Sequence, residues 1–240
     1  MSQYRITLTA NAGVVVQSRQ IKFWSDAVHT EHVPGFSSVS PALWRDICAS
    51  GVCAKPNLIL FSHRHPDHYS RELTRQARIL WPYAELAAPF RDFPDQFLLD
   101  EHHCQLSMRG VTFRFAPLIH EPGPHDVNQP PNYGCIADFG GCRLLIPGDC
   151  AVAEPSLAKF VGEQPVDIAL VDFPWVTLKK GREFIQHYLH PSHLLVYHLP
   201  FPEDDELHYR PAAEQAVRAL DFIPDVRILG LPLQSEVIEV

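Results

Sequence analysis

The chain has 240 residues, of which 46% are hydrophobic and 20% charged, and its formal net charge at pH 7 is -8. This composition predicts a globular protein with a sizeable core, and with no repeat or linker to divide it we expect one domain over residues 1–240. Nucleic-acid-binding surfaces concentrate Lys and Arg, so the acidic balance argues against such a partner. No apolar run is long enough for a membrane span, so we expect no membrane partner either.

The expected elements are strands interspersed with helices. Strands are expected at 4–9, 13–17, 20–24, 57–62, 85–88, 111–119, 133–139, 142–146, 166–171, 194–197 and 226–229. Helices are expected at about 41–49 after a cap at Ser40, from 71 to about 81 after a cap at Ser70, and at 182–189 and 209–220. This order predicts a mixed α/β chain with two sheets.

The cysteines and the N-terminus indicate the cellular compartment. The six cysteines show no tight paired spacing, and the first residues show no basic segment followed by a long apolar stretch. We therefore expect reduced thiols, no signal peptide and a cytoplasmic location. Cys150 is expected to be a small buried residue rather than a metal ligand.

The densest group of chemically active residues is the hexapeptide His63-Arg64-His65-Pro66-Asp67-His68. It follows the apolar run 58–61, which predicts a buried strand, so the hexapeptide lies at a carboxyl end where α/β folds build ligand sites. Three imidazoles and a carboxylate suit zinc, iron(II) or manganese. Chance clustering among 14 histidines is the alternative, and the composition makes it rare.

Three later strand ends also carry polar residues. His120 follows the apolar run 111–119, and His198 follows the run 194–197. Asp149 follows the run 144–146 and Gly148, which permits a sharp turn. Each residue alone would more often be an ordinary hydrogen-bonded polar group, but together with the hexapeptide they predict a dinuclear metal site.

The series His63-x-His65-x-Asp67-His68, His120, Gly148-Asp149 and His198 resembles the motifs of the metallo-β-lactamase-fold metal-dependent hydrolase superfamily. Asp26, after the strand 20–24, matches the acidic residue that opens the series. The resemblance covers nearly the whole chain. It implies a four-layer αβ/βα sandwich, in which two mixed β-sheets are flanked by helices and the metals lie at one edge between the sheets.

The resemblance also implies two divalent metal ions, Zn²⁺ before Mn²⁺ or Fe²⁺. The first ion would be held by His63, His65 and His120, the second by Asp67, His68 and His198, and Asp149 would bridge them. Asp26 would orient ligands through hydrogen bonds. The stretches 6–14 and 172–198 are most similar to the ascorbate-6-phosphate lactonase-like branch of small hydrolases. The chain departs from that branch at Ala27, where Pro is common, and at Ser62, where Thr is common; we expect neither to touch a ligand.

Such a centre predicts a dinuclear hydrolase that uses a metal-bridging hydroxide to cleave a small, anionic ester, lactone or phosphoester. Asp67 and Asp149 would hold metal and orient the nucleophile. The leaving group also needs a proton donor, for which His125 is favoured over Tyr69 and Tyr133. Each of these three is otherwise a solvated loop residue or a packed aromatic.

Several alternatives stay open. Iron-dependent oxidation on the same fold would also use this centre, and so would a non-catalytic metal-binding or ligand-sensing module. We expect a small-molecule substrate and leave a homo-oligomer open. Asp172 is read either as a carboxylate near the site or as a turn residue. His29, His32 and the acidic run 203–206 are read as solvated loop residues.

Overall fold

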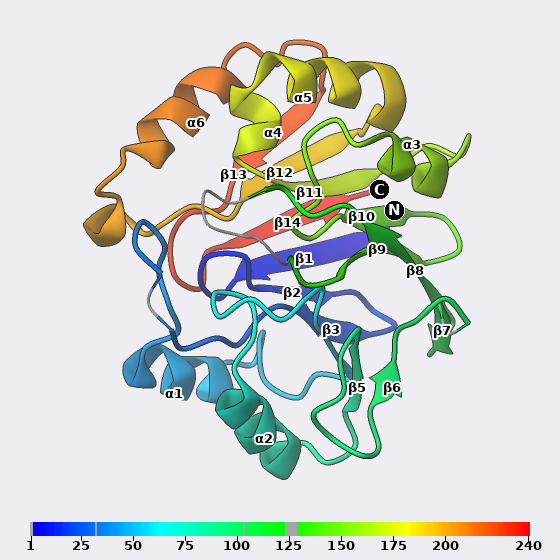
Figure 1. Ribbon diagram of the computed structural model, residues 1–240, viewed down its shortest axis with the longest axis vertical. Helices are drawn as coiled ribbons and strands as arrows, with labels where there is room; N and C mark the ends of the chain where they lie inside the picture. Colours follow the sequence, from blue (N-terminus) through cyan, green and yellow to red (C-terminus); the bar gives the residue numbers. More distant parts are fainter. Residues whose placement is uncertain (1, 32, 103, 123–128) are drawn as a thin grey trace.

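Two β-sheets of seven strands each form the centre of the protein, and helices cover their outer faces (Figure 1). The structure is a computed structural model that describes residues 2–31, 33–102, 104–122 and 129–240. Helices α1 (Pro41–Ala49) and α2 (Arg71–Leu80) lie on the side of the first sheet, and α3 (Pro155–Val161), α4 (Pro174–Thr177), α5 (Lys179–Phe184) and α6 (Tyr209–Val217) on the side of the second. This arrangement confirms the predicted sandwich of two mixed sheets flanked by helices.

The first sheet has the strand order β14-β1-β2-β3-β4-β5-β6. Its antiparallel part pairs β14, β1, β2 and β3, and its parallel part continues from β3 to β6. The bounds are β1 (Gln3–Leu8), β2 (Val14–Gln17), β3 (Lys22–Ser25), β4 (Leu58–Leu60), β5 (Glu85–Ala88), β6 (Phe97–Leu98) and β14 (Ser235–Glu239).

The second sheet repeats this plan in the order β13-β12-β11-β10-β9-β8-β7. Strands β7 to β10 are antiparallel, and β10 to β13 are parallel. The bounds are β7 (Gln105–Met108), β8 (Val111–Leu118), β9 (Asn132–Asp138), β10 (Arg143–Ile146), β11 (Ile168–Asp172), β12 (His193–Tyr197) and β13 (Asp225–Ile228). Every residue of β4, β10 and β11 is buried, as expected for parallel strands covered on both faces.

The predicted helix caps are confirmed. The Ser40 hydroxyl accepts the Leu43 N–H, and the Ser70 hydroxyl accepts the Leu73 N–H. In the described part of the chain, no helix has the length and apolar character that crossing a bilayer requires.

Several elements differ from the sequence prediction. Strands β6, β7 and β14 and helices α3 and α4 were not predicted, and α6 ends at Val217 instead of 220. The acidic run is not merely solvated, because the Asp205 carboxylate accepts the backbone N–H groups of Tyr209 and Arg210 at the start of α6. Asp204 likewise accepts a hydrogen bond from the Ser37 hydroxyl.

Candidate metal centre

The predicted ligands meet at one edge, where strands of both sheets end. From the first sheet, Asp26 follows β3 and the hexapeptide follows β4 after two further residues. From the second sheet come His120 after β8, Asp149 after β10 and His198 after β12. The two sheets therefore bring side chains more than 130 residues apart into one cluster.

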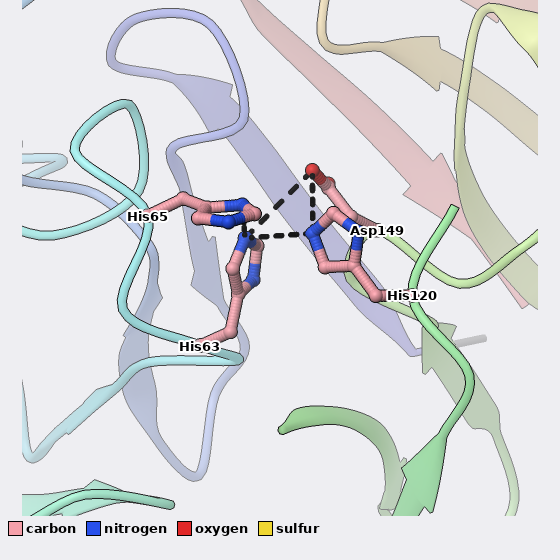
Figure 2. Close-up of side chains that lie close together, drawn as sticks. All are labelled: His63, His65, His120 and Asp149. Atoms are coloured by element: carbon pink, nitrogen blue, oxygen red, sulfur yellow. Dashed lines mark hydrogen bonds and ion pairs between the residues drawn. The ribbon is translucent and has the colours of Figure 1, made fainter. Parts of the chain in front are cut away.

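Figure 2 shows His63, His65, His120 and Asp149 pointing toward one another. One potential ligand atom from each of the four lies within 4.8 Å of the others. The His63 Nε2 atom is 3.0 Å from His65 Nδ1, 3.3 Å from His120 Nε2 and 3.8 Å from an Asp149 oxygen. This grouping matches the first predicted ligand set, with Asp149 added.

The second group consists of Asp67, His68 and His198, whose potential ligand atoms also lie within 4.8 Å of one another. The Nε2 atoms of His68 and His198 are 3.1 Å apart. Asp149 contacts this group as well, because one of its oxygens lies 3.2 Å from His68 Nε2 and the other 3.6 Å from His198 Nε2. Asp149 thus lies between the two groups, at the position expected of a bridging ligand.

The donor atoms suit divalent cations. Imidazole nitrogen and carboxylate oxygen are the ligands of zinc, iron and manganese sites. The buried Asp149 Oδ1 atom has no hydrogen-bond partner among the described residues, and a buried carboxylate oxygen is costly unless something binds it. The residues therefore form a cluster that could hold metal ions.

Electrostatics supports the same conclusion. Burial lowers the pKa of His63 well below its ordinary value, so this imidazole stays neutral and keeps a free lone pair. Burial alone would raise the pKa of Asp149, but His68 and His198 beside it hold that pKa well below the ordinary value. Asp149 is therefore an anion, as a metal ligand must be.

Asp26 supports the centre through its contacts with Ser62 and His68. It is fully buried, and its carboxylate accepts the Ser62 N–H at 2.8 Å and the Ser62 hydroxyl at 2.7 Å. Its Oδ2 atom also lies 3.2 Å from His68 Nδ1, which directs His68 Nε2 toward the cluster. The expectation that Ser62 touches no ligand is wrong, because its hydroxyl oxygen is 2.9 Å from His63 Nδ1.

Two asparagines that contact potential ligands were not identified from the sequence. The Asn11 amide donates to Asp67 Oδ2 at 3.2 Å, and Asn132 accepts the Asp149 N–H at 3.1 Å. Gly148 makes the second contact possible, because it has φ +60° and a Cβ there would lie 2.3 Å from Asn132 Oδ1. Asn11 lies in a turn inside the resembling stretch 6–14, but neither asparagine has a local pattern that predicts its partner.

Tyr69 and Tyr133, two of the three predicted proton donors, are not among the residues that line the cavity at the centre. The Tyr69 hydroxyl donates to Asp92 at 2.6 Å, and its ring packs on Phe61 and Phe90. Tyr133 is largely buried at the start of β9, and its backbone N–H donates to the Ser62 carbonyl. His125 lies outside the described residues.

Three further residues that the sequence places near the predicted ligands are Cys150, His29 and His32. Cys150 is buried, as expected, and burial raises the pKa of its thiol. The reading of His29 as a solvated loop residue is wrong, because its side chain is fully buried and its Nε2 atom lies 3.2 Å from the Ala10 carbonyl oxygen. His32 lies outside the described residues.

A cavity of about 380 Å³ opens onto the centre. Its lining includes His65, Asp67, His120, Asp149 and His198, together with loop residues around them. Asp172 also lines it and is 7% exposed, with Oδ1 unpaired among the described residues. Of the two readings of Asp172, the structure therefore favours the carboxylate near the site.

The two mixed sheets, the flanking helices and the histidine-rich edge define the metallo-β-lactamase fold. The chain is similar to a diiron β-hydroxylase, CmlA, from Streptomyces venezuelae (TM-score 0.67, 17% identity), covering 99% of this chain and 54% of that one. The chain thus spans about half the length of CmlA.

Two other similar structures match over nearly their whole length. One is the metallo hydrolase Igni18 from Ignicoccus hospitalis (TM-score 0.67, 14% identity, 99% of both chains). The other is an isothiocyanate hydrolase from Delia radicum gut bacteria (TM-score 0.66, 15% identity, 97% of this chain and 98% of that one). No family model and no curated protein matches the sequence. At these low identities the structural likeness shows the fold alone, and the narrower resemblance to the lactonase-like branch stays a prediction.

Proposed function

We propose that the protein is a dinuclear metal-dependent hydrolase that cleaves an ester, lactone or phosphoester in a small molecule. The observation that carries the proposal is the position of Asp149, whose two oxygens reach both groups of potential ligands. The likeness to Igni18 and to the isothiocyanate hydrolase supports it, because both are hydrolases on this fold.

The chain's own residues would hold and orient the centre. His63, His65 and His120 would hold one ion, Asp67, His68 and His198 the other, and Asp149 both. A bound pair of divalent ions supplies Lewis acidity for activating water and for stabilising negative charge on the substrate. The hydrogen bond that Asn11 donates to Asp67, and the contact between the Ser62 hydroxyl oxygen and His63 Nδ1, would help to keep Asp67 and His63 in place.

Asp172 is our candidate for the proton donor to the leaving group. Burial and the nearby Asp149 carboxylate raise the pKa of Asp172 well above its ordinary value, so its protonated form is favoured relative to that of an exposed aspartate, as a proton donor requires. We expect Asp172→Asn to lower kcat about 10- to 100-fold for alkyl esters, whose leaving group needs a proton. For 4-nitrophenyl esters, whose leaving group departs as an anion, kcat should change little. An equal loss for both ester types, or none, would contradict this role; metal content serves as the control.

Metal content and turnover test the proposed function directly. Protein purified without added metal, and protein reloaded with Zn²⁺, Mn²⁺ or Fe²⁺, should bind about two ions per chain by mass spectrometry of the metals. The loaded forms should hydrolyse at least one compound in a panel of carboxylic esters, lactones and phosphoesters. Metal binding without turnover of any of them would instead support a non-catalytic metal-binding or ligand-sensing module.

A second candidate function is iron-dependent oxidation. The likeness to CmlA favours it, because CmlA is a diiron β-hydroxylase. This candidate expects two iron atoms per chain in protein isolated without added metal, and no hydrolysis by the zinc-loaded form. Hydrolysis by the zinc-loaded form would favour the first proposal.

A further inference from the structure

The cavity beside the candidate metal centre has apolar walls. Beyond the potential ligands, its lining includes Val33, Phe36, Pro66, Pro122, Phe173 and Pro174. These residues come from three separate loops and from the start of α4. A substrate group that enters this cavity therefore loses contact with water and gains contact with apolar side chains on several sides.

Two phenyl rings in the wall are held in place by packing. The Phe36 ring meets the His198 imidazole edge-on at 4.9 Å between centroids, and it lies 6.1 Å from the Tyr209 ring. Tyr209 in turn stacks on Phe173 at 4.5 Å. Tyr209, at the start of α6, thus contacts both rings, and such contacts fix ring positions before any ligand binds.

The charges around the cavity argue against the anionic substrate that the sequence suggested. No Lys or Arg lines the described part of the cavity, and residues 32, 103 and 123–128 include neither type. Arg64, in the hexapeptide, pairs instead with Asp92 at 2.7 Å. The titratable side chains beyond the potential ligands are Glu121 and Asp172, and neither of them can carry a positive charge. A carboxylate or phosphate away from the metals would meet these without a cationic partner.

A cationic substrate also fits this cavity poorly. Glu121 already accepts the Val152 N–H at 2.6 Å, and Asp172 is largely buried. The metal ions that the centre would hold would also repel a cationic substrate. A neutral substrate remains once anionic and cationic substrates are disfavoured, and a neutral substrate agrees with the apolar walls of the cavity.

We propose that the substrate is electrically neutral and carries an apolar, preferably aromatic, group that packs against Phe36 and Phe173 in the cavity wall. This inference rests on the proposed hydrolase function and names its substrate class. The reacting bond would then face the potential ligands on the cavity floor, and the apolar group would lie along the wall.

Three phenyl acetates that carry a neutral, an anionic or a cationic meta substituent test the charge preference: 3-tert-butylphenyl acetate, 3-acetoxybenzoate and 3-acetoxy-N,N,N-trimethylanilinium. With zinc-loaded protein, and after correction for each ester's rate with hydroxide, kcat/KM for the neutral ester should exceed both charged ones about tenfold. The corresponding acetanilides, which resist hydrolysis, give affinities by calorimetry and decide the question if the esters turn over slowly. A charged member that binds or reacts as well as the neutral one would overturn the inference.

Ring-removing variants test the position of the apolar group. Phe36→Ala and Phe173→Ala should each weaken binding of the neutral acetanilide about tenfold. Tyr188→Ala is the matched control, because Tyr188 is 58% exposed and does not line this cavity. Unchanged affinity in both Phe variants would contradict the inference. Metal content and turnover of the ester panel by the same proteins separate its failure from failure of the proposed function, which would show as absent metal or as bound metal without turnover.

Discussion

Replacing Asp149 with Ala is expected to remove bound metal and to lower kcat at least about a thousandfold while the protein stays folded. Asp149 lies within 4 Å of His63, His68, His120 and His198, so its loss removes a ligand atom from both groups at once. The fold should survive because the adjacent strand β10 is completely buried and paired on both sides. Metal analysis, turnover and circular dichroism measured on one preparation check this.

Two further variants make this result interpretable. His65→Ala removes a potential ligand of the first group alone and should lose part of the metal and most of the activity. Asp221→Ala, at an exposed carboxylate beyond α6, should behave like the unchanged protein. Full activity in Asp149→Ala or His65→Ala would refute the assignment of the centre.

Asp26→Ala is expected to give the largest loss of stability, about 3–5 kcal/mol in the metal-free protein. The buried carboxylate accepts two hydrogen bonds from Ser62 and lies within 3.2 Å of His68 Nδ1, so its removal leaves buried donors unpaired. Metal affinity should also fall about 10- to 100-fold, because His68 loses the group that orients it. Chemical denaturation and metal titration measure the two effects.

Asp26→Asn is the informative comparison for this residue. It keeps the shape and one carbonyl oxygen for the Ser62 N–H but removes the charge beside His68. We expect a smaller loss of stability than with Ala and a comparable loss of metal affinity. If Ala and Asn variants were both as stable as the unchanged protein, the supporting role of Asp26 would be wrong.

The strands around the centre were predictable because their signals are local. The runs before His63, Asp149 and His198 are apolar over several consecutive residues, and each forms a buried strand. The caps of α1 and α2 depend on hydroxyls next to the helices they start. In contrast, β14 pairs with β1, more than 225 residues away, so its short sequence has little meaning without the partner.

By itself, the sequence determined which residue types follow which buried strands, and therefore the ligands of the candidate centre and their order. Only the tertiary structure decided how they are supported, because the contacts of Asn11, Ser62 and Asn132 join segments that local patterns cannot relate. It also decided the character of the cavity. Composition gives a formal net charge of -8 for the whole chain, whereas substrate recognition depends on which few side chains the loops place beside the centre.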